Sequence, residues 1–128
     1  MTRVVAFIPD LLFGSNVLGA LRAAGHDPAL VSDSDGLGRE LPGAQVLIID
    51  LTADPMARIE QVSRIPHEGV KTLAFYSHVE ADVRALAEQA GVDLIGPRSR
   101  MAREGEELVA RMGAGGLSDG SKGSTPQA

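Results

Sequence analysis

The sequence predicts an α/β protein built on a doubly wound parallel sheet, and two features of the chain indicate this fold class. Apolar runs of strand length alternate with segments whose apolar residues recur at helical spacing. The run QVLIID, residues 45–50, is evenly apolar, as is typical of a parallel strand that helices cover on both faces. Because parallel neighbours need right-handed crossover connections, this alternation predicts an open sheet with helices on both sides.

The first half of the chain supplies two strands and two helical segments. RVVAFI at 3–8 is a β-rich run, and PALVS at 28–32 is a short second strand. Between them, LLFGSNVLGALRAAG at 11–25 carries apolar residues at helical spacing, and Gly25 is placed to end that helix. DSDGLGRELPGA at 33–44 is interrupted by glycines, so it predicts a weak helix or a loop.

The second half continues the alternation from the strand at 45–50. Asp54 and Pro55 predict the cap and the first position of a helix that Pro66 stops, with Met56 on its apolar face. The remaining predicted elements are strands at 70–76 and 92–96 and helices at 80–91 and 102–112, with Gly91 closing the helix at 80–91.

Length and composition indicate one domain followed by an unstructured tail. A chain of 128 residues suits a single domain with a single core. Residues 113–128, GAGGLSDGSKGSTPQA, are dominated by glycine and serine and lack apolar periodicity, so they cannot bury enough surface to offset their ordering entropy. We therefore expect one domain over 1–112 and a disordered tail over 113–128.

Charge and cysteine content argue against several classes of function. The net charge is −5, no basic run is present, and three phenylalanines and one tyrosine are the only aromatic residues, which disfavours direct nucleic-acid binding. The absence of cysteine excludes disulfides and thiolate metal sites and suits a reducing compartment. No apolar stretch approaches the length of a membrane helix. We expect a soluble cytoplasmic protein.

Polar side chains gather at the predicted carboxyl ends of the strands, which is the edge where parallel α/β sheets bind ligands. These residues are Asp10 after the first strand, Asp50 and Thr52 after the third, Ser77 and His78 after the fourth, and Arg98 and Ser99 after the fifth. Two carboxylates, several hydroxyls, an imidazole and a guanidinium together predict a charged pocket at this edge.

Over residues 3–112 the sequence resembles a response-regulator receiver (CheY-like) domain of an atypical, stand-alone or pseudo-receiver kind. The likeness rests on LLFGSNVLGALRAAGHDP for the first helix and turn, on AQVLIIDLTADPM and TLAFYSHVEADVRALAEQAGVDLI for the third to fifth strand regions, and on GPRSRM. The resemblance implies a flavodoxin-like sheet of five parallel strands in the order 2-1-3-4-5. It also implies two-component signalling, a phosphorelay in which a histidine kinase supplies a phosphoryl group to an aspartate.

The resemblance assigns roles to these strand-end residues. Asp50 falls on the phosphoacceptor that ends strand three, and Ser77 is the nearest match to the hydroxyl residue that contacts the phosphoryl group. Arg98 stands where the family has a lysine. Thr52 is grouped with Ser77 and Arg98 as phosphate-binding, and His78 and Ser99 are placed on the rim of the site.

Several positions depart from the family pattern. The family has two adjacent acids after strand one to hold Mg²⁺, whereas this chain has Pro9 and Asp10, so Asp10 and Asp50 alone would hold the ion. Arg98 replaces a compact ammonium by a planar fork, and Ser99 replaces the usual proline. Ile95 stands at the aromatic switch position. These changes indicate atypical activation.

Each site residue also has a purely structural explanation. Asp50 could stabilise the turn into the following helix, and Asp10 could be the N-cap of the helix that follows it. His78 could be a polar strand-end residue without chemistry. Arg98 could pair with Asp50 and hold an empty site closed by a charge-assisted bond, as expected of a pseudo-receiver.

Two function classes follow, with a third of lower weight. The first is a single-domain receiver-like signalling protein that accepts a phosphoryl group on Asp50 and signals through protein–protein contacts. The second is a phosphate-independent adaptor or interaction module, and the third is a small-anion-binding protein that uses Arg98, Ser99 and the first helix N-terminus. An enzyme is disfavoured because no nucleophile and base are adjacent in sequence. The expected partners are a signalling protein or histidine kinase, or a second copy of the chain.

Overall fold

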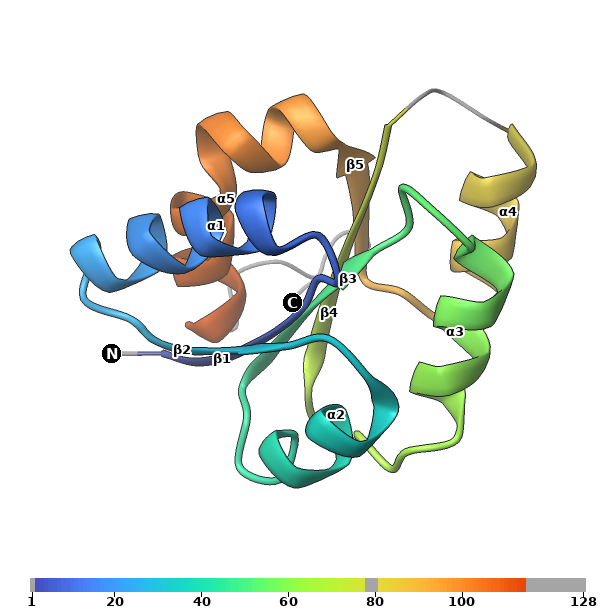
Figure 1. Ribbon diagram of the computed structural model, residues 1–128, viewed down its shortest axis with the longest axis horizontal. Coiled ribbons are helices and arrows are strands. Elements are labelled where there is room, and N and C mark those ends of the chain that lie inside the picture. The colour runs from blue at the N-terminus through green and yellow to red at the C-terminus, as the bar shows by residue number, and fades with distance from the viewer. Residues whose placement is uncertain (1, 78–80, 115–128) are drawn as a thin grey trace, which may run out of the picture.

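The computed structural model describes residues 2–77 and 81–114, and a parallel sheet of five strands forms its centre (Figure 1). The strands are β1 (Arg3–Phe7), β2 (Asp27–Val31), β3 (Val46–Asp50), β4 (Lys71–Tyr76) and β5 (Leu94–Pro97). They lie in the order β2-β1-β3-β4-β5, and each neighbouring pair is parallel. The predicted fold class and strand order are confirmed, and Asp50 ends the middle strand.

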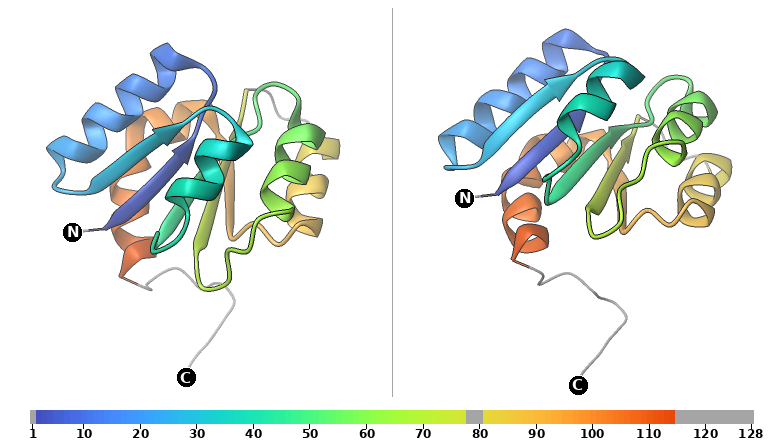
Figure 2. Two further views of the ribbon diagram at one scale, coloured as in Figure 1. Left: turned by 60° about the horizontal axis from the view of Figure 1, so that its bottom comes forward. Right: turned by 90° about the horizontal axis from the view of Figure 1, so that it is seen from below.

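Helices cover both faces of the sheet (Figures 1 and 2). In the described part of the chain they are α1 (Leu11–Ala23), α2 (Ser34–Glu40), α3 (Pro55–Ser63), α4 (Ala81–Gln89) and α5 (Arg98–Gly113). One core lies between the sheet and the pair α1 and α5, and the other lies between the sheet and α2, α3 and α4. This is the doubly wound arrangement that the alternating sequence predicts.

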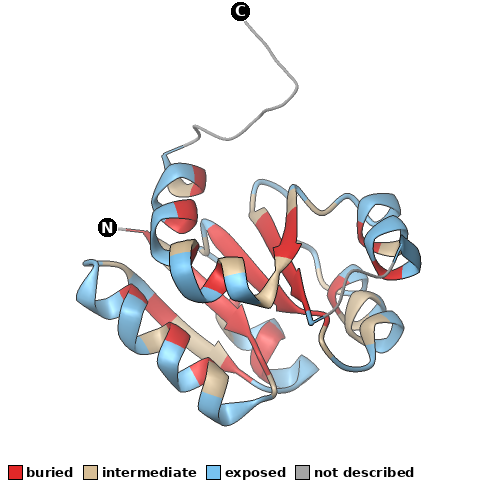
Figure 3. Cartoon of the chain, turned by 90° about the horizontal axis from the view of Figure 1, so that it is seen from above, coloured by how far each residue is buried: buried red, intermediate tan, exposed pale blue. Residues whose placement is uncertain are grey.

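The strands divide their side chains between the two cores because successive residues of a strand point to opposite faces. Ile48 and Phe75 belong to the core under α1 and α5, whereas Ile49 and Tyr76 belong to the core under α2, α3 and α4. All five residues of β3 are buried, whereas β2 and β5 also contain less buried residues, and Figure 3 shows most of the buried positions on the sheet and on the helix faces turned toward it. An evenly apolar strand is therefore needed in the middle of this sheet.

Two helices, α1 and α4, end next to the glycines that the sequence analysis placed at their ends. Gly25 has φ +88° just after α1, and Gly91 has φ +82° two residues after α4. Side chains rarely adopt this left-handed backbone, which glycine adopts without a steric penalty. The predicted ends of these two helices are confirmed to within two residues.

The last helix begins earlier than the sequence predicts. α5 starts at Arg98, not at residue 102, and continues through Gly113. Pro97 has extended backbone and sits at the cap position without a side-chain hydrogen bond, and Met101 in the first turns is buried. Basic residues at 98 and 100 are unfavourable at a positive helix end, so local patterns do not predict a start there, and burial of Met101 decides the start instead.

The segment at 33–44, predicted to be a weak helix or a loop, contains the short helix α2, and the Asp33 carboxylate caps its first turn by accepting from the Gly36 N–H at 2.7 Å. Two further expectations are corrected. Met56, expected on the buried face of α3, is 72% exposed. The expected tail at 113–128 begins too early, since Gly113 ends α5 and Ala114 is its C-cap, and residues 115–128 lie outside the described part.

Across residues 2–77 and 81–114, no helix combines the length and the apolar character required to cross a bilayer.

Candidate functional site

The carboxyl ends of β1, β3, β4 and β5 lie along one edge of the sheet, and the residues that follow them form the candidate site. Since β1, β3, β4 and β5 are consecutive neighbours, Asp10, Asp50, Ser77 and Arg98 all come to this edge. The sequence prediction that polar side chains gather there is confirmed for these four residues. The ion pair that Arg98 forms differs from the one that the sequence suggested.

Asp50 is a nearly buried carboxylate with one oxygen occupied. Only 4% of the residue is exposed. Its Oδ1 accepts two hydrogen bonds from Thr52, one from the backbone N–H at 2.8 Å and one from the hydroxyl at 2.6 Å. Its Oδ2 accepts no hydrogen bond from residues 2–77 or 81–114. The structural explanation, that Asp50 stabilises the turn after β3, is therefore confirmed, and one oxygen is left for other chemistry.

Arg58 on α3 fixes the loop that follows Asp50, and sequence analysis did not identify it. Its Nε donates to the Asp50 backbone carbonyl at 3.3 Å, and its Nη2 donates to the Ala53 carbonyl at 3.4 Å. Its Nη1 donates to the Gln61 side chain at 3.0 Å, and its guanidinium lies 5.2 Å from the Phe7 ring centroid. Its sequence signal was weak because one arginine in an arginine-rich chain is not distinctive. Arg58 thus holds the phosphoacceptor candidate through its backbone.

Asp54 lies in the same loop and does not cap α3 as predicted. It has φ +50° and ψ +52°, the left-handed region, and its side chain makes no cap hydrogen bond. A residue with a Cβ pays a steric cost in this region, although aspartate tolerates it better than most. Pro55 at the first helical position confirms the other half of that prediction.

Asp10 uses both of its oxygens within the protein. Its Oδ1 accepts from the Phe13 backbone N–H at 3.1 Å, which makes Asp10 the N-cap of α1. Its Oδ2 lies 3.5 Å from Nη2 of Arg98. The N-cap role is therefore confirmed. The second oxygen is available to a metal ion only if Arg98 moves.

Arg98 is directed to Asp10, and the predicted pairing with Asp50 is wrong for this structure. Besides its contact with Asp10, the Arg98 guanidinium stacks over the Phe13 ring at 4.1 Å from the centroid. Phe13 in turn packs against Phe75 of β4, with ring centroids 5.2 Å apart. The stack holds the cation on the α1 and α5 side of the sheet, because α1 and α5 share that face.

The other residues predicted for the site are Ser77, Ser99, His78 and Thr52. Ser77 is exposed immediately after β4, and within the described residues no hydrogen bond joins it to Asp50. Ser99 is exposed in the first turn of α5. His78 lies outside the described residues. Thr52, predicted to bind phosphate, donates its hydroxyl to Asp50 in this structure.

A divalent ion would find an incomplete ligand set at this edge. In the described part of the chain, no group of three or more acidic or histidine side chains is placed to hold a metal. Asp50 offers Oδ2, and Asp10 offers Oδ2 after release of Arg98. Two carboxylates suit Mg²⁺, which keeps several of its waters, so these residues fit the ion only partly.

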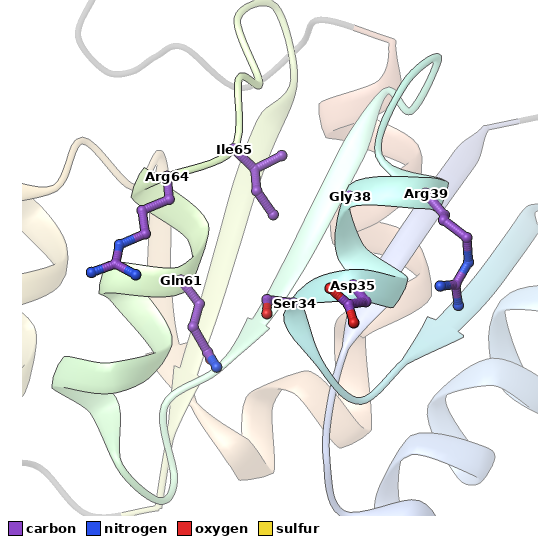
Figure 4. Close-up of a pocket in the computed structure, with 7 residues that line it drawn as sticks. All are labelled: Ser34, Asp35, Gly38, Arg39, Gln61, Arg64 and Ile65. Carbon is purple, nitrogen blue, oxygen red and sulfur yellow. The ribbon is translucent and has the colours of Figure 1, made fainter.

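A concave surface lies between α2 and α3, and Asp50 is not among the residues that line it. It is an open groove of about 570 Å³ lined by residues of both helices. Figure 4 shows the guanidinium groups of Arg39 and Arg64 pointing away from each other and out of this groove. Arg64 pairs with Glu60 of its own helix at 3.3 Å. The groove therefore lacks a converging set of charged groups.

Comparison with known proteins gives matches in structure but not in sequence. No family model matches the chain, and a search of curated proteins finds no relative. A response regulator from Thermotoga maritima superposes with a TM-score of 0.75 at 14% identity, covering 89% of this chain and 98% of that one. The receiver domain of a Francisella response regulator gives 0.75 at 11% identity, covering 91% and 100%.

One similar structure belongs to a protein that is not described as a response regulator. A candidate pilus assembly-related protein from Burkholderia pseudomallei superposes with a TM-score of 0.68 at 21% identity, covering 89% of this chain and 90% of that one. At these identities the similarity establishes the fold, and function has to be argued from the site. The chain has the flavodoxin-like fold of response-regulator receiver domains, with its strands in the order 2-1-3-4-5.

Proposed function

We propose that this chain is a receiver-like signalling module of the cytoplasm in which Asp50 accepts a phosphoryl group. The observation that carries the proposal is the Asp50 carboxylate at the carboxyl end of the middle strand, buried, anchored through Oδ1 and with Oδ2 free of hydrogen bonds from the described residues. An anchored carboxylate with one open oxygen is arranged as a nucleophile of fixed direction. The signal would pass through protein–protein contacts.

The transfer step is a displacement at phosphorus. Oδ2 of Asp50 attacks the phosphorus of a phosphohistidine on a histidine kinase, the new O–P bond forms, and the P–N bond breaks. The histidine nitrogen leaves with the electron pair and is protonated, and an acyl phosphate remains on Asp50. In such transfers, catalysis consists mainly of positioning and of stabilising charge on the phosphoryl oxygens.

One cationic group at the same edge of the sheet could stabilise that charge. Arg98 reaches the same edge from the start of α5, and its ion pair with Asp10 is long, at 3.5 Å, and partly exposed on both sides, so it costs little to open. Asp10 and Asp50 are the residues that would hold Mg²⁺, which when bound neutralises charge on phosphoryl oxygens. Thr52 and Ser77 supply hydroxyls nearby.

A second candidate function is a phosphate-independent adaptor, and the Asp10–Arg98 pair favours it. This pair occupies the one carboxylate that follows β1 and the cation that follows β5, so these two charges neutralise each other without a ligand. A small-anion site at the N-terminus of α1 has less support, because the Asp10 carboxylate already caps that helix end.

Beryllofluoride, a mimic of the phosphoryl group, distinguishes these functions. Beryllofluoride and Mg²⁺ are titrated into the wild type and Asp50→Asn, and amide NMR shifts are recorded. Asparagine keeps an oxygen that can accept from Thr52, so it is a matched control. We expect metal-dependent shifts centred on Asp50, Thr52, Ser77 and Arg98 that are lost in Asp50→Asn. If the wild type shows no response, phosphoryl transfer is rejected and the phosphate-independent adaptor becomes the supported function.

A further inference from the structure

The exposed side of α1 carries almost no charge. A helix on the surface of a protein ordinarily presents charged residues to water on the side opposite the core. Of the thirteen residues of α1, LLFGSNVLGALRA, only Arg22 is charged, whereas the neighbouring α5 has charged residues in each of its turns. Leu11 and Leu12 at the start of α1 are 68% and 76% exposed. Such a helix is typical of one that is buried on both sides, so its outer side is a candidate contact surface.

A groove beside α1 extends this uncharged surface. α1 and α5 cover the same face of the sheet (Figure 1), and between them lies a groove of about 170 Å³. Among the residues that line it, Val17, Leu21 and Met101 are buried, whereas Asn16 and Ala20 are exposed and uncharged. The groove is therefore open to an apolar side chain from another molecule.

A second copy of the chain is the occupant that this surface favours. In a two-fold dimer both partners use the same patch, so each copy must supply a projecting group and the space that receives it, as α1 does with Leu12 and the groove. Arg103 and Glu106 line the groove from α5, are exposed and have opposite signs. The contact of Arg103 with Glu104, at 3.4 Å, is itself exposed and therefore weak. Two copies can thus set Arg103 of one against Glu106 of the other, without a conflict of like charges.

We propose that the outer side of α1 and the groove between α1 and α5 form a self-association face, on which Leu12 of each copy packs against the groove of the other. Asp50 is not part of this face, and the proposal does not rest on phosphoryl transfer. One helix and one groove make a smaller contact than a standard protein interface. The dimer therefore dissociates on dilution, with a dissociation constant on the order of tens of micromolar.

Sedimentation equilibrium of the full chain over a wide range of concentration measures this association. We expect wild type to pass from monomer to dimer, and Leu12→Glu to raise the dissociation constant about tenfold or more, because it places a charge where an apolar side chain is buried. Met56→Glu is the matched control, since Met56 is 72% exposed on α3, outside the face, and it should leave the constant unchanged. Both positions are exposed, so both variants should keep the circular dichroism spectrum of the wild type.

Charge reversal tests which surfaces meet. Glu106→Arg alone sets like charges against each other and should weaken the dimer, whereas combining it with Arg103→Glu restores opposite charges and should restore the dimer. The proposal is rejected if wild type stays monomeric at every concentration, if Met56→Glu weakens the dimer as much as Leu12→Glu does, or if the double variant does not recover. A dimer formed only by a chain that ends after residue 114 would also overturn it, because the removed residues would then compete for this face.

Discussion

Asp10 shows how one residue can serve the fold and the candidate site together. Its Oδ1 completes the first turn of α1 through the Phe13 N–H, and its Oδ2 faces Arg98. The cap satisfies a backbone donor that has no partner within the helix. The ion pair lies at a partly exposed position, where such contacts contribute little to stability. The cap therefore contributes more to the stability of the fold than the ion pair does.

Substitution of Asp10 can separate these two roles. Asp10→Ala removes both, and we expect it to lower the free energy of unfolding by about 1 kcal/mol. Asp10→Asn keeps a good cap and removes only the charge, so we expect a loss of about 0.5 kcal/mol or less. Urea unfolding followed by circular dichroism measures both. An equal loss in the two variants would show that the ion pair, and not the cap, is the stabilising interaction.

The loop after Asp50 is specified by single residues that sequence patterns describe poorly. Asp54 adopts a left-handed backbone without a compensating side-chain bond, where glycine would be the usual choice. The donors of Thr52 and Arg58 hold the same loop around Asp50. At the scale of residues, the site is therefore a restrained loop beside a nucleophile candidate.

At the scale of elements, α1 packs closely on the sheet through a glycine. Gly14 is buried, and a Cβ at this position would lie 2.8 Å from Cδ1 of Leu30 on β2 and 3.5 Å from Cγ2 of Ile8. Gly19 lies on the exposed side of the same helix, and a Cβ there would meet nothing within 4 Å. The two glycines therefore destabilise the helix equally relative to alanine, but only Gly14 is packed against neighbouring side chains.

This contrast gives a matched pair of variants within one helix. Gly19→Ala should raise the free energy of unfolding by about 0.5–1 kcal/mol, because alanine is the better helix former. Gly14→Ala has the same advantage, but Leu30 must move to admit the methyl group, so we expect it to be less stable than Gly19→Ala by about 1 kcal/mol or more. Thermal and urea unfolding measure the difference. Equal stabilisation would mean that α1 and β2 are not closely packed at Gly14.

The start of α5 illustrates why element boundaries are hard to predict from sequence. Local signals favoured a start at residue 102, because basic residues precede it and the cap residue in the structure, Pro97, makes no side-chain cap bond. The structure begins the helix at Arg98, where Met101 is buried in the core under α1 and α5. Burial of one large apolar side chain outweighs an unfavourable helix end, since the former contributes about 1.5–3 kcal/mol and the latter about 0.3–1 kcal/mol.

At the scale of the whole molecule, two cores share one sheet. Among the described residues, Met112 is the core residue that comes last in sequence. We predict that a chain ending after residue 114 has the same free energy of unfolding as the full chain, within about 0.5 kcal/mol. The reason is that the removed residues, 115–128, lack the apolar periodicity needed to add to a core. Urea unfolding of the two chains measures this. A clear loss in the shortened chain would show that the segment contributes to the fold.

Much of the molecule could be predicted because local patterns agreed with the global fold. The five strands, the helices between them and the sheet edge that gathers Asp10, Asp50, Ser77 and Arg98 all follow from periodicity and from the rule for parallel sheets. The pairing of these residues could not be predicted. Two carboxylates at this edge could accept from Arg98, and the structure pairs it with Asp10; the hydrogen bond from Thr52 to Asp50 likewise depends on the local loop geometry.

The sequence by itself determined the layers of this protein and the place of Asp50 at the end of a buried strand, because strand and helix periods are local properties of the chain. Only the tertiary structure decided which charges meet. Arg98 and Asp10 are 88 residues apart in sequence, and Phe13 and Phe75 form the stack that directs the guanidinium to Asp10. Such pairings depend on distances through space that several partners could satisfy, and packing selects one of them.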